Sequence, residues 1–479
     1  MSILQVDDIQ GIILRGYGRL ESACFLLLSI ARPAAAKAWL STLDVCNAEH
    51  KPGDTDRCIN VAFTRAGLEQ LGLAEKPMSM LAPEFHAGMA ATEHRQRILG
   101  DVGDSGPDRW QWGGPRNPEP HLLLMLYARD HNALSALLDE QQAKLSSSGL
   151  ELIAQLDSSR LPDRKEHFGF RDGVGQPGID GFDTETSPGN TIAAGEFILG
   201  YLNAYGQYTE RPLVSPDHDP AGILRQAPDD PTQRDLGMNG SYLVFRQLSQ
   251  DVAGFWKFID AKTRRDDGSP NPEARKKLAS KMVGRWPSGT PLVKSPDADP
   301  LALSDDDDFL YYGSDDRHGF KCPIGSHIRR TNPRDSLEPE PGSERSIEVG
   351  KRHRIIRRGR AYGAPVASSM ESSDILAAGD ITGERGLHFI CFNTHIGRQF
   401  EFIQHTWVNN PKFDGLYEDD DPLIGDRAGA GSKPGGIFTV QCDPIRTRVT
   451  GMPRFVHVRG GAYFFMPGIR AIRFLSSLR

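Results

Sequence analysis

Long hydrophobic runs, an excess of positive charge and paired cysteines are all missing from this sequence of 479 residues. No stretch approaches the roughly 18 consecutive apolar residues that mark a membrane span, so a transmembrane helix is not expected. The formal net charge of -7 argues against general binding to nucleic-acid phosphates. The six cysteines are scattered without a C-x-x-C pair, which indicates neither a zinc site nor a disulfide framework.

The N-terminal segment also lacks the features of a secretory signal. Asp7 and Asp8 stand where a signal peptide carries positive charge, and no apolar core follows them. Hydrophobic residues make up 38% of the chain and charged residues 25%, which is typical of a globular protein. We therefore expect a soluble, cytoplasmic protein that does not bind membranes, with a large core and more than one domain.

The first part of the chain alternates short apolar runs with amphipathic helical patterns. Its order is close to β-α-β-(helix)-β-α-β, which is typical of a ferredoxin-like α+β layer, an antiparallel sheet with helices on one face. The predicted strands are 24–30, 59–64, 121–128 and 150–157, and the predicted helices are 33–43, 65–73 and 131–145.

A Pro-rich, acidic stretch at about 209–236 separates this part from a second one with the same alternation. A duplicated α+β architecture is therefore indicated, although no sequence repeat accompanies the repeated order. Residues 265–318 are polar and Pro-rich, and we interpret the acidic run 305–308 as a solvated loop. The predicted strands of the second part are 240–248, 386–393 and 461–468, and the predicted helices are 251–262, with Asp251 as N-cap, and 396–410.

One loop, EHFGFRDGVGQPGI at 166–179, places an acid between glycines. Gly169 and Gly173 allow the backbone to turn tightly and to approach a flat ligand closely. An acid held in an apolar pocket suits proton transfer near neutral pH, because desolvation raises its pKa. The alternative is a surface turn in which Arg171 and Asp172 are simply solvated.

Two further segments are rich in basic residues. In FKCPIGSHIRRTNPRD at 320–335, His327 precedes three arginines. A neutral imidazole is the commonest haem-iron ligand, and guanidinium groups pair well with carboxylates such as haem propionates. A structural or surface histidine, or a phosphate- or nucleic-acid-binding strand, would explain the same residues. The segment KRHRIIRRGRAYG at 351–363 would by itself indicate an anion-binding or RNA-binding patch.

Together these three segments resemble the dye-decolourising, or DyP-type, haem peroxidases, and the similarity is greatest to their larger, intracellular bacterial branch. Segments near the start (DIQGIILRGYG), at 384–404 and near the end (GGAYFFMPGI) are also similar, so the resemblance covers nearly the whole chain. The family's motifs are matched by Gly169-Phe170-Arg171-Asp172-Gly173, by His327 with Arg329, Asn332 and Arg334, and by Arg357, which has Arg358 and Arg360 beside it and Tyr362 five residues later.

The resemblance implies an α+β fold of two ferredoxin-like halves, of the dimeric α+β barrel type, with antiparallel sheets flanked by helices. The half at 1–215 would contain the Asp172 loop, and the half at 216–479 would bind one haem b. His327 would ligate the iron, with Glu401 as the candidate carboxylate partner of its other ring nitrogen. The further cofactor contacts that the resemblance implies are Gly173, Val174, Gly175, Arg329, Asn332, Arg334, Leu387 and Phe389, the last two on one face of a strand.

The implied reaction is the reduction of hydrogen peroxide. Asp172 would move a proton from the near peroxide oxygen to the far one, and Arg357 would stabilise the negative charge that develops as the O–O bond breaks. Aromatic or dye-like donors would supply single electrons, through surface residues where the donors are too large for the pocket. The candidate relay residues are Trp110, Trp112, Trp256, Trp286, Trp407 and the pair Tyr311 and Tyr312.

Two other functions stay open at this point. A haem-handling protein with little peroxidase turnover would keep His327 and the basic contacts, but it would not require Asp172 and Arg357 together. A nucleic-acid-binding protein would bind no haem, and its binding would depend strongly on salt.

Overall fold

The computed structural model describes residues 3–50, 53–158, 160–183, 189–379, 382–427 and 435–478. In this part of the chain the main feature is one antiparallel sheet of nine strands. The strands are β1 (Ser22–Ile30), β2 (Arg57–Phe63), β3 (Leu122–Ala128), β4 (Leu150–Ser158), β10 (Ser241–Gln250), β11 (Ile356–Arg357), β12 (Arg360–Tyr362), β13 (Gly386–Asn393) and β16 (Val456–Met466).

The strand order, β11-β13-β10-β16-β2-β3-β1-β4, divides the sheet into two blocks that follow the sequence. The block β2-β3-β1-β4 comes from the first part of the chain and the block β11-β13-β10-β16 from the second, with β12 also paired to β13. The blocks join where Phe465 of β16 faces Phe63 of β2. The two predicted ferredoxin-like units are therefore present as one continuous sheet.

The sheet curls so that its two ends approach each other. His388 of β13 lies 3.2 Å from the carbonyl oxygen of Asp157 in β4, and β12 also contacts β4. Inside the curl, the rings of Phe25 and Phe245 meet edge to face with centroids 5.4 Å apart, although they come from different blocks. One face of the sheet thus forms a closed apolar interior, whose burial is a main source of stability.

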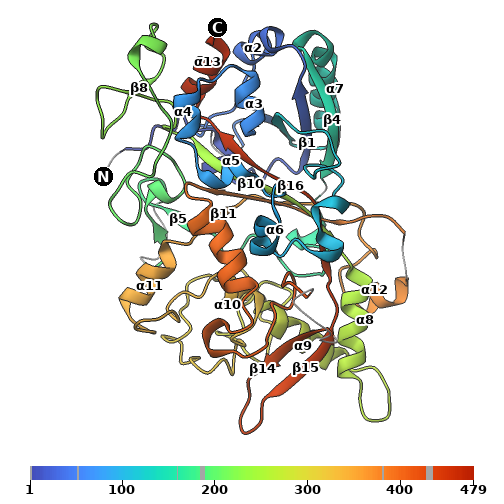
Figure 1. Cartoon of the computed structure of the whole chain (residues 1–479). Helices are drawn as coiled ribbons and strands as arrows, with labels where there is room; N and C mark the ends of the chain where they lie inside the picture. Colours follow the sequence, from blue (N-terminus) through green and yellow to red (C-terminus); the bar gives the residue numbers. More distant parts are fainter. Residues whose placement is uncertain are drawn as a thin grey trace.

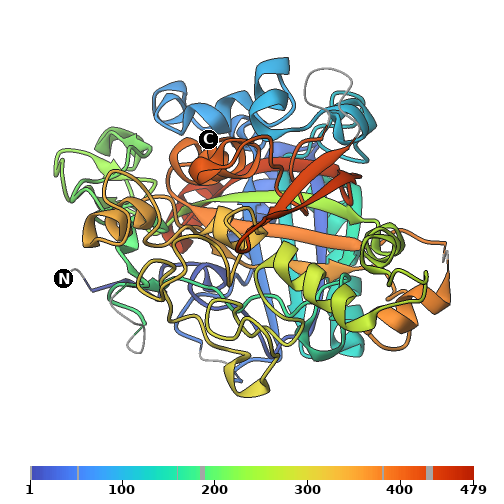
Figure 2. The same ribbon diagram turned by 90° about the horizontal axis from the view of Figure 1, so that it is seen from below.

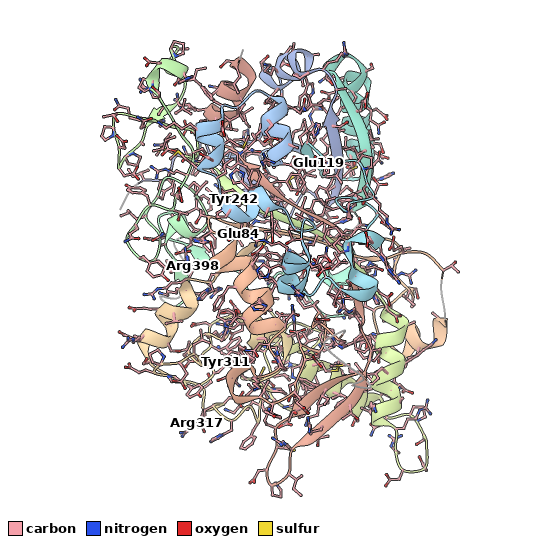
Figure 3. All side chains as sticks on the ribbon, viewed as in Figure 1. Glu84, Glu119, Tyr242, Tyr311, Arg317 and Arg398 are labelled. Carbon is pink, nitrogen blue, oxygen red and sulfur yellow. The ribbon has the colours of Figure 1, made fainter. Side chains whose placement is uncertain are left out.

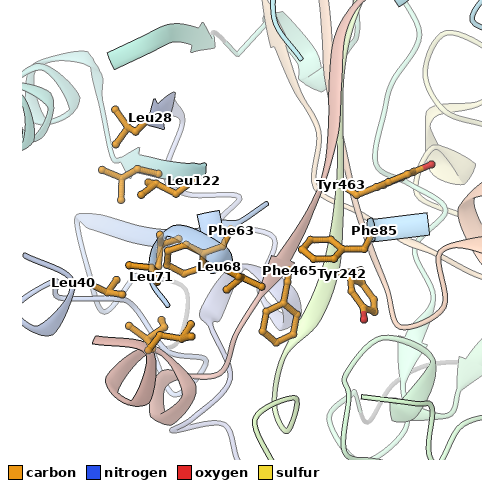
Figure 4. Packing of buried hydrophobic residues seen from close by; sticks show 14 of the residues in the cluster. Leu28, Leu40, Phe63, Leu68, Leu71, Phe85, Leu122, Tyr242, Tyr463 and Phe465 are labelled. Carbon is orange, nitrogen blue, oxygen red and sulfur yellow. The ribbon is translucent and has the colours of Figure 1, made fainter. Parts of the chain in front are cut away.

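The opposite face of the first block is covered by helices (Figure 1). Alternate residues of β1 and β3, such as Leu28 and Leu122, pack there against Leu40, Leu68 and other helical side chains, as Figure 4 shows. The period of two in these strands is the reason that both faces can be apolar and yet pack against different partners. The covering helices are α2 (Pro33–Ser41), α3 (Arg65–Gln70), α7 (His131–Ser148) and α13 (Ile469–Ser477).

The segments between β10 and β16 build the lower part of the molecule in Figure 1, and in the view from below they lie in front of the long strands (Figure 2). They include the hairpin β14 (Gly436–Val440) and β15 (Thr447–Met452). The helices here are α8 (Val252–Thr263), α9 (Pro272–Val283), α10 (His327–Thr331), α11 (Glu344–Lys351) and α12 (Ser372–Ala378).

Short elements complete the described chain. No helix in it is both long and apolar enough to cross a membrane. The short helices are α1 (Gly11–Leu14), α4 (Glu75–Ser79), α5 (Pro83–Ala87) and α6 (Glu93–Leu99), and the short strands are β5 (Gly178–Ile179), β6 (Thr191–Ile192), β7 (Leu213–Val214), β8 (Arg225–Gln226) and β9 (Arg234–Asp235).

Most predicted elements are confirmed within a few residues, and the strand predicted at 386–393 coincides with β13. Asp251 caps α8 as expected, because its side chain accepts the Gly254 N–H at 2.8 Å. The polar, Pro-rich stretch 265–318 contains a helix that the sequence analysis did not predict, α9. Its signals were in the sequence: Asn271 caps the helix, Pro272 begins it and a glycine ends it.

The predicted helix at 396–410 is also corrected in detail. The segment forms two π-helical stretches, Gly397–Glu401 and Ile403–Val408, instead of a regular α-helix. The wider turn shifts each later side chain relative to the 3.6-residue period. The division of the chain at residues 215 and 216 stays a prediction.

Replacing Phe245 with alanine should test the closed interior. Phe245 is fully buried against Phe25, Trp112 and His388, so Phe245→Ala is expected to lower the free energy of unfolding by about 3–5 kcal/mol. The matched control is Phe320→Ala, because Phe320 is 50% exposed; it should change the value by less than about 0.5 kcal/mol. Urea unfolding of both variants measures the difference, and equal stabilities would contradict a packed interior at Phe245.

Candidate active site

A cavity of about 260 Å³ brings together segments that are far apart in the sequence. Its walls come from the loop at 166–175, the ends of β10 and β13, and the segments 327–334 and 354–359. Tyr311, another wall residue, is labelled in the lower part of Figure 3, on the side where the segments between β10 and β16 gather. All three motifs of the sequence analysis therefore meet at one cavity.

His327, the first residue of α10, lines this cavity and has a buried carboxylate behind it. Its Nδ1 lies 3.0 Å from Oδ2 of Asp421, which is fully buried. Oδ1 of Asp421 accepts the backbone N–H groups of Leu423 and Ile424, both at 2.9 Å. No group in the described residues hydrogen bonds with Nε2 of His327, so this nitrogen is available toward the cavity.

The charge on Asp421 is stabilised despite its burial. Burial favours the neutral acid, but the adjacent His327 and the N–H group of Ile424 outweigh it, so the pKa of Asp421 lies below its usual value. An ionised Asp421 fixes the proton of His327 on Nδ1 and raises the basicity of Nε2.

The expectation that Glu401 is the partner of His327 was wrong. The Glu401 carboxylate forms an ion pair with Arg95 and accepts the hydroxyl of Tyr463 at 2.7 Å. In the π-helical segments Phe400 and Gln404 line the cavity, whereas Glu401 does not. Asp421 is 94 residues from His327 in the sequence, and no local spacing identified it.

Asp172 and Arg357 face each other at the cavity. Nη1 of Arg357 lies 3.5 Å from Oδ1 of Asp172, and both side chains are partly exposed to the open space. The Gly173 N–H donates to the same oxygen at 2.6 Å, while Nη2 of Arg357 donates to the Gly175 carbonyl at 3.2 Å. An acid and a cation are thus held next to each other with room for a small molecule beside them.

The neighbouring arginines point elsewhere, which resolves the register of the basic segment. Arg358 donates to the carbonyl oxygens of residues 12, 13 and 14, and Arg360 donates to those of Tyr17 and Leu20. Only Arg357 of these three lines the cavity within the described chain. The spacing to Tyr362 therefore predicts the correct residue, because Arg357 is the arginine whose side chain lines the cavity.

The loop before Asp172 is rigid for local reasons. Gly169 has φ +92°, and a Cβ there would lie 2.7 Å from the Met370 carbonyl oxygen, so only glycine fits. Phe170 is buried and lies parallel to Trp256, with ring centroids 6.4 Å apart. Arg171 borders the cavity, but its guanidinium bonds to Ser304 and Asp305 outside it. Gly173, Val174 and Gly175 all line the cavity.

Arg334 and Asn332 line the cavity as predicted, but Arg329 does not. Arg329 is fully buried, and its Nη1 donates to Asp316 and to the Cys322 carbonyl. Residues two positions apart on a helix point about 200° apart, so His327 and Arg329 occupy opposite sides of α10. The prediction that Arg329 contacts a cofactor is therefore corrected.

The acidic run 305–308 is not simply a solvated loop. Asp307 lines the cavity and accepts hydrogen bonds from both Arg285 and Arg334. Arg334 has a left-handed backbone, φ 56°, and its Nε is buried with no partner in the described residues. Arg354 also lines the cavity, where burial lowers its pKa to about 10, still high enough to stay charged. The charged runs of the sequence did not indicate that Asp307, Arg334 and Arg354 meet at the cavity.

Apolar side chains form the rest of the wall. Leu387 and Phe389 both line the cavity, so the prediction that they share one face of the strand is confirmed. The other apolar wall residues are Phe168, Phe170, Val174, Leu248, Val283, Ile328, Ile355, Phe400, Ile403, Val408, Leu423, Ile424 and Val456.

No family model matches the chain, but known proteins do. It is 30% identical to a dye-decolorizing peroxidase of Exidia glandulosa over 498 residues, which covers 98% of this chain and 87% of that protein. It is 31% identical to a dye-decolorizing peroxidase of Auricularia auricula-judae over 506 residues, covering 98% and 86%. A multifunctional dye peroxidase of Amycolatopsis is 28% identical, covering 98% and 96%.

Solved structures agree with these relatives. A decolorizing peroxidase from Auricularia auricula-judae has a TM-score of 0.76 and 27% identity, over 99% of this chain and 100% of that one. A dye-decolorizing peroxidase in complex with 2,6-dimethoxyphenol has a TM-score of 0.78 and 25% identity, with the same coverage. Similarity along nearly the whole length of these proteins, at up to 31% identity, shows that the chain belongs to the dye-decolourising peroxidase family.

Proposed function

We propose that this chain binds one haem b in the cavity, ligates its iron through His327 and reduces hydrogen peroxide with electrons from dyes, phenols or other one-electron donors. The observation that carries the proposal is the meeting of His327, backed by Asp421, with the Asp172–Arg357 pair at one cavity. A haem-handling role would not need that pair, so its presence favours the peroxidase.

The wall residues fit haem in three respects. The apolar majority suits the faces of a porphyrin, and the unpartnered Nε2 of His327 is the ligand atom that haem iron commonly takes. Arg334 and Arg354 are cations at the same cavity, and the buried Nε of Arg334 lacks a partner. Propionate carboxylates are suitable partners for such guanidinium groups. Bound haem would supply the iron that holds peroxide and the electrons that its reduction requires.

Asp421 sets the properties of His327 in this proposal. The ionised carboxylate holds the Nδ1 proton, so Nε2 faces the cavity as a strong electron-pair donor. The backbone N–H groups that Asp421 accepts keep the carboxylate from rotating away.

Asp172 and Arg357 act on the peroxide itself. The Asp172 carboxylate takes the proton from one peroxide oxygen and returns it to the other, which leaves as water. The Arg357 guanidinium, fixed by the Gly175 carbonyl, stabilises the negative charge on the departing oxygen. Two protons and two electrons, the latter from two donor molecules, complete the reduction of one peroxide to two waters.

The donor class follows from the relatives. One related structure is a complex with 2,6-dimethoxyphenol, and the curated relatives are named for dyes. Every tryptophan of the chain is buried, which disfavours tryptophan as the surface contact. Tyr311 lines the cavity and Tyr312, next to it, is partly exposed, so this pair is the preferred relay for large donors. The relatives are mostly fungal with one from Amycolatopsis, and we keep the larger bacterial branch as a proposal.

His327→Ala should lose iron ligation and most of the haem, because no other histidine lines the cavity in the described residues. Absorbance in the Soret region after haem titration and gel filtration measures retention. The matched control, His318→Ala, removes an exposed histidine of the same segment and should retain haem fully. Retention by His327→Ala equal to that of the control would rule out His327 as the ligand.

Asp421→Asn should weaken haem binding by about 10–100-fold, because the amide cannot match the charge behind His327. Glu401→Gln is the control, since the Glu401 carboxylate contacts Arg95 and Tyr463 instead. Haem affinities from titration, with thermal unfolding of each apoprotein, separate ligation from stability. A loss for Glu401→Gln and none for Asp421→Asn would reverse the assignment.

Asp172→Asn should retain haem and slow the reaction with peroxide by about 10²–10⁴-fold, because the proton acceptor is lost. Arg357→Leu should retain haem and slow it by about 10²–10³-fold, because the charge on the departing oxygen is no longer stabilised. Stopped-flow absorbance under single turnover gives the rates. Asp305→Asn, an exposed acid in the acidic run, serves as control. Full activity of Asp172→Asn would refute the proton-transfer role.

A further inference from the structure

Besides Asp172 and the arginine-paired Asp307, the carboxyl group of Glu166 lines the cavity, six residues before Asp172 in the sequence. Its Oε2 accepts the Phe168 N–H at 2.9 Å and the side-chain amide of Gln250 at 2.7 Å. Its Oε1 accepts the Phe170 N–H at 3.0 Å. One carboxylate therefore ties two backbone groups of the loop to the end of β10.

Backbone hydrogen bonds also connect Glu166 to the rest of this loop. The Glu166 N–H donates to the Phe170 carbonyl at 2.9 Å, and the Gly169 N–H donates to the Glu166 carbonyl at 2.8 Å. Phe168 and Phe170 are buried against α8, where Phe168 and Phe255 have ring centroids 4.4 Å apart. The segment just before Asp172 is thus a compact loop that is held together by hydrogen bonds to the Glu166 carboxylate and backbone.

Few charged groups face Glu166. Asp172 of its own loop is the charged neighbour that acts on it, and Arg357 of β11 in turn pairs with Asp172. On the loop itself, Lys165 reaches toward Glu371, and Arg171 toward Asp305. Gln250 of β10 is neutral, and the α8 residues that pack against the loop are aromatic. No cation therefore pairs directly with Glu166 in the described residues.

His167, the next residue, does not supply a charge either. Its Nε2 lies 2.8 Å from the Tyr362 carbonyl, and burial lowers its pKa to about 4, so it is neutral at physiological pH.

We propose that Glu166 is a positioning residue for Asp172: its carboxyl group fixes the loop, and its ionisation adds an unpaired negative charge at the cavity that opposes peroxide cleavage. This inference rests on the proposed role of Asp172. With Glu166 protonated, the departing oxygen develops its negative charge beside Arg357 and Asp172, which carries the transferred proton. With Glu166 ionised, the same charge develops near one more negative charge, which raises the barrier.

The pH at which this change occurs follows from the surroundings. Burial raises the pKa of Glu166 to about 7, the hydrogen bonds from Phe168, Gln250 and Phe170 oppose the rise, and Asp172 adds to it. Glu166 is therefore protonated below about pH 7 and ionised above it. The rate of peroxide cleavage in the wild-type haem-loaded enzyme should fall as the pH rises through this value.

Glu166→Gln tests the inference, because the amide stays neutral at every pH. The rate of its reaction with peroxide, measured by stopped flow, should not fall as the pH rises through about 7. Gln250→Leu is the matched second variant: it keeps the carboxyl group but removes a donor that stabilises the ionised form, so its fall should move to higher pH. Thermal unfolding checks that both variants fold.

An infrared titration gives a readout that does not depend on turnover. The difference spectrum between wild type and Glu166→Gln should contain the C=O stretch of a buried carboxylic acid, which disappears as the pH rises through about 7. A Glu166→Gln enzyme that keeps the fall with the wild-type midpoint, or a difference spectrum without that band, would overturn the inference. If Asp172→Asn reacts normally with peroxide, the proton-transfer role of Asp172 fails and the inference fails with it; if Asp172→Asn is slow while Glu166→Gln matches wild type at every pH, only the role of Glu166 fails.

Discussion

The register of β13 between β10 and the short strands β11 and β12 is the constraint on which the site depends. Residues of a strand alternate between faces, so this register sends Ile390 and Phe392 into the closed interior and Leu387 and Phe389 to the cavity. Arg357 pairs with Cys391, two residues after Phe389, and its side chain is therefore presented on the cavity side. A slip of one residue would exchange the two faces, placing His388 at the cavity and turning Arg357 away.

Buried charge is the second constraint, because several arginine side chains line one cavity. Arg285 and Arg334 donate hydrogen bonds to Asp307, Arg357 donates to the Gly175 carbonyl, and Arg354 donates to the side-chain amide oxygen of Asn190. Charges removed from water need such partners or they shift their protonation. The acidic run is therefore part of the site's architecture.

Much of the fold was predictable from periodicity, since the strands of both blocks are apolar runs flanked by helix signals, and β13 was located to the residue. The site was predictable only through short motifs that resemble a family. Those motifs identified His327, Asp172 and Arg357, which the fold brings to one cavity. They missed Asp421, Asp307 and Arg354, because long-range contacts leave no local spacing to recognise.

Two errors have specific physical origins. Arg329 was assigned to the cofactor because it is close to His327 in sequence, but a helical turn separates their directions by about 200°. Glu401 was chosen as a carboxylate on the segment after β13, but its side chain bonds to Arg95 and Tyr463, and the partner of His327, Asp421, comes from a different segment. Proximity in the sequence is therefore a weak guide to which charged side chains meet at a site.

The position of β16 has a consequence for how the protein is made. It is the last strand of the sheet in sequence, yet it occupies the middle of the sheet, between β10 and β2. On the ribosome, the block β2-β3-β1-β4 could therefore be complete while residues 159–455 are still to be added, and during this time Phe63 of β2 would lack its partner Phe465. Incompletely paired strands and uncovered apolar surface favour aggregation, so the first block is expected to be most prone to aggregation during this interval of synthesis.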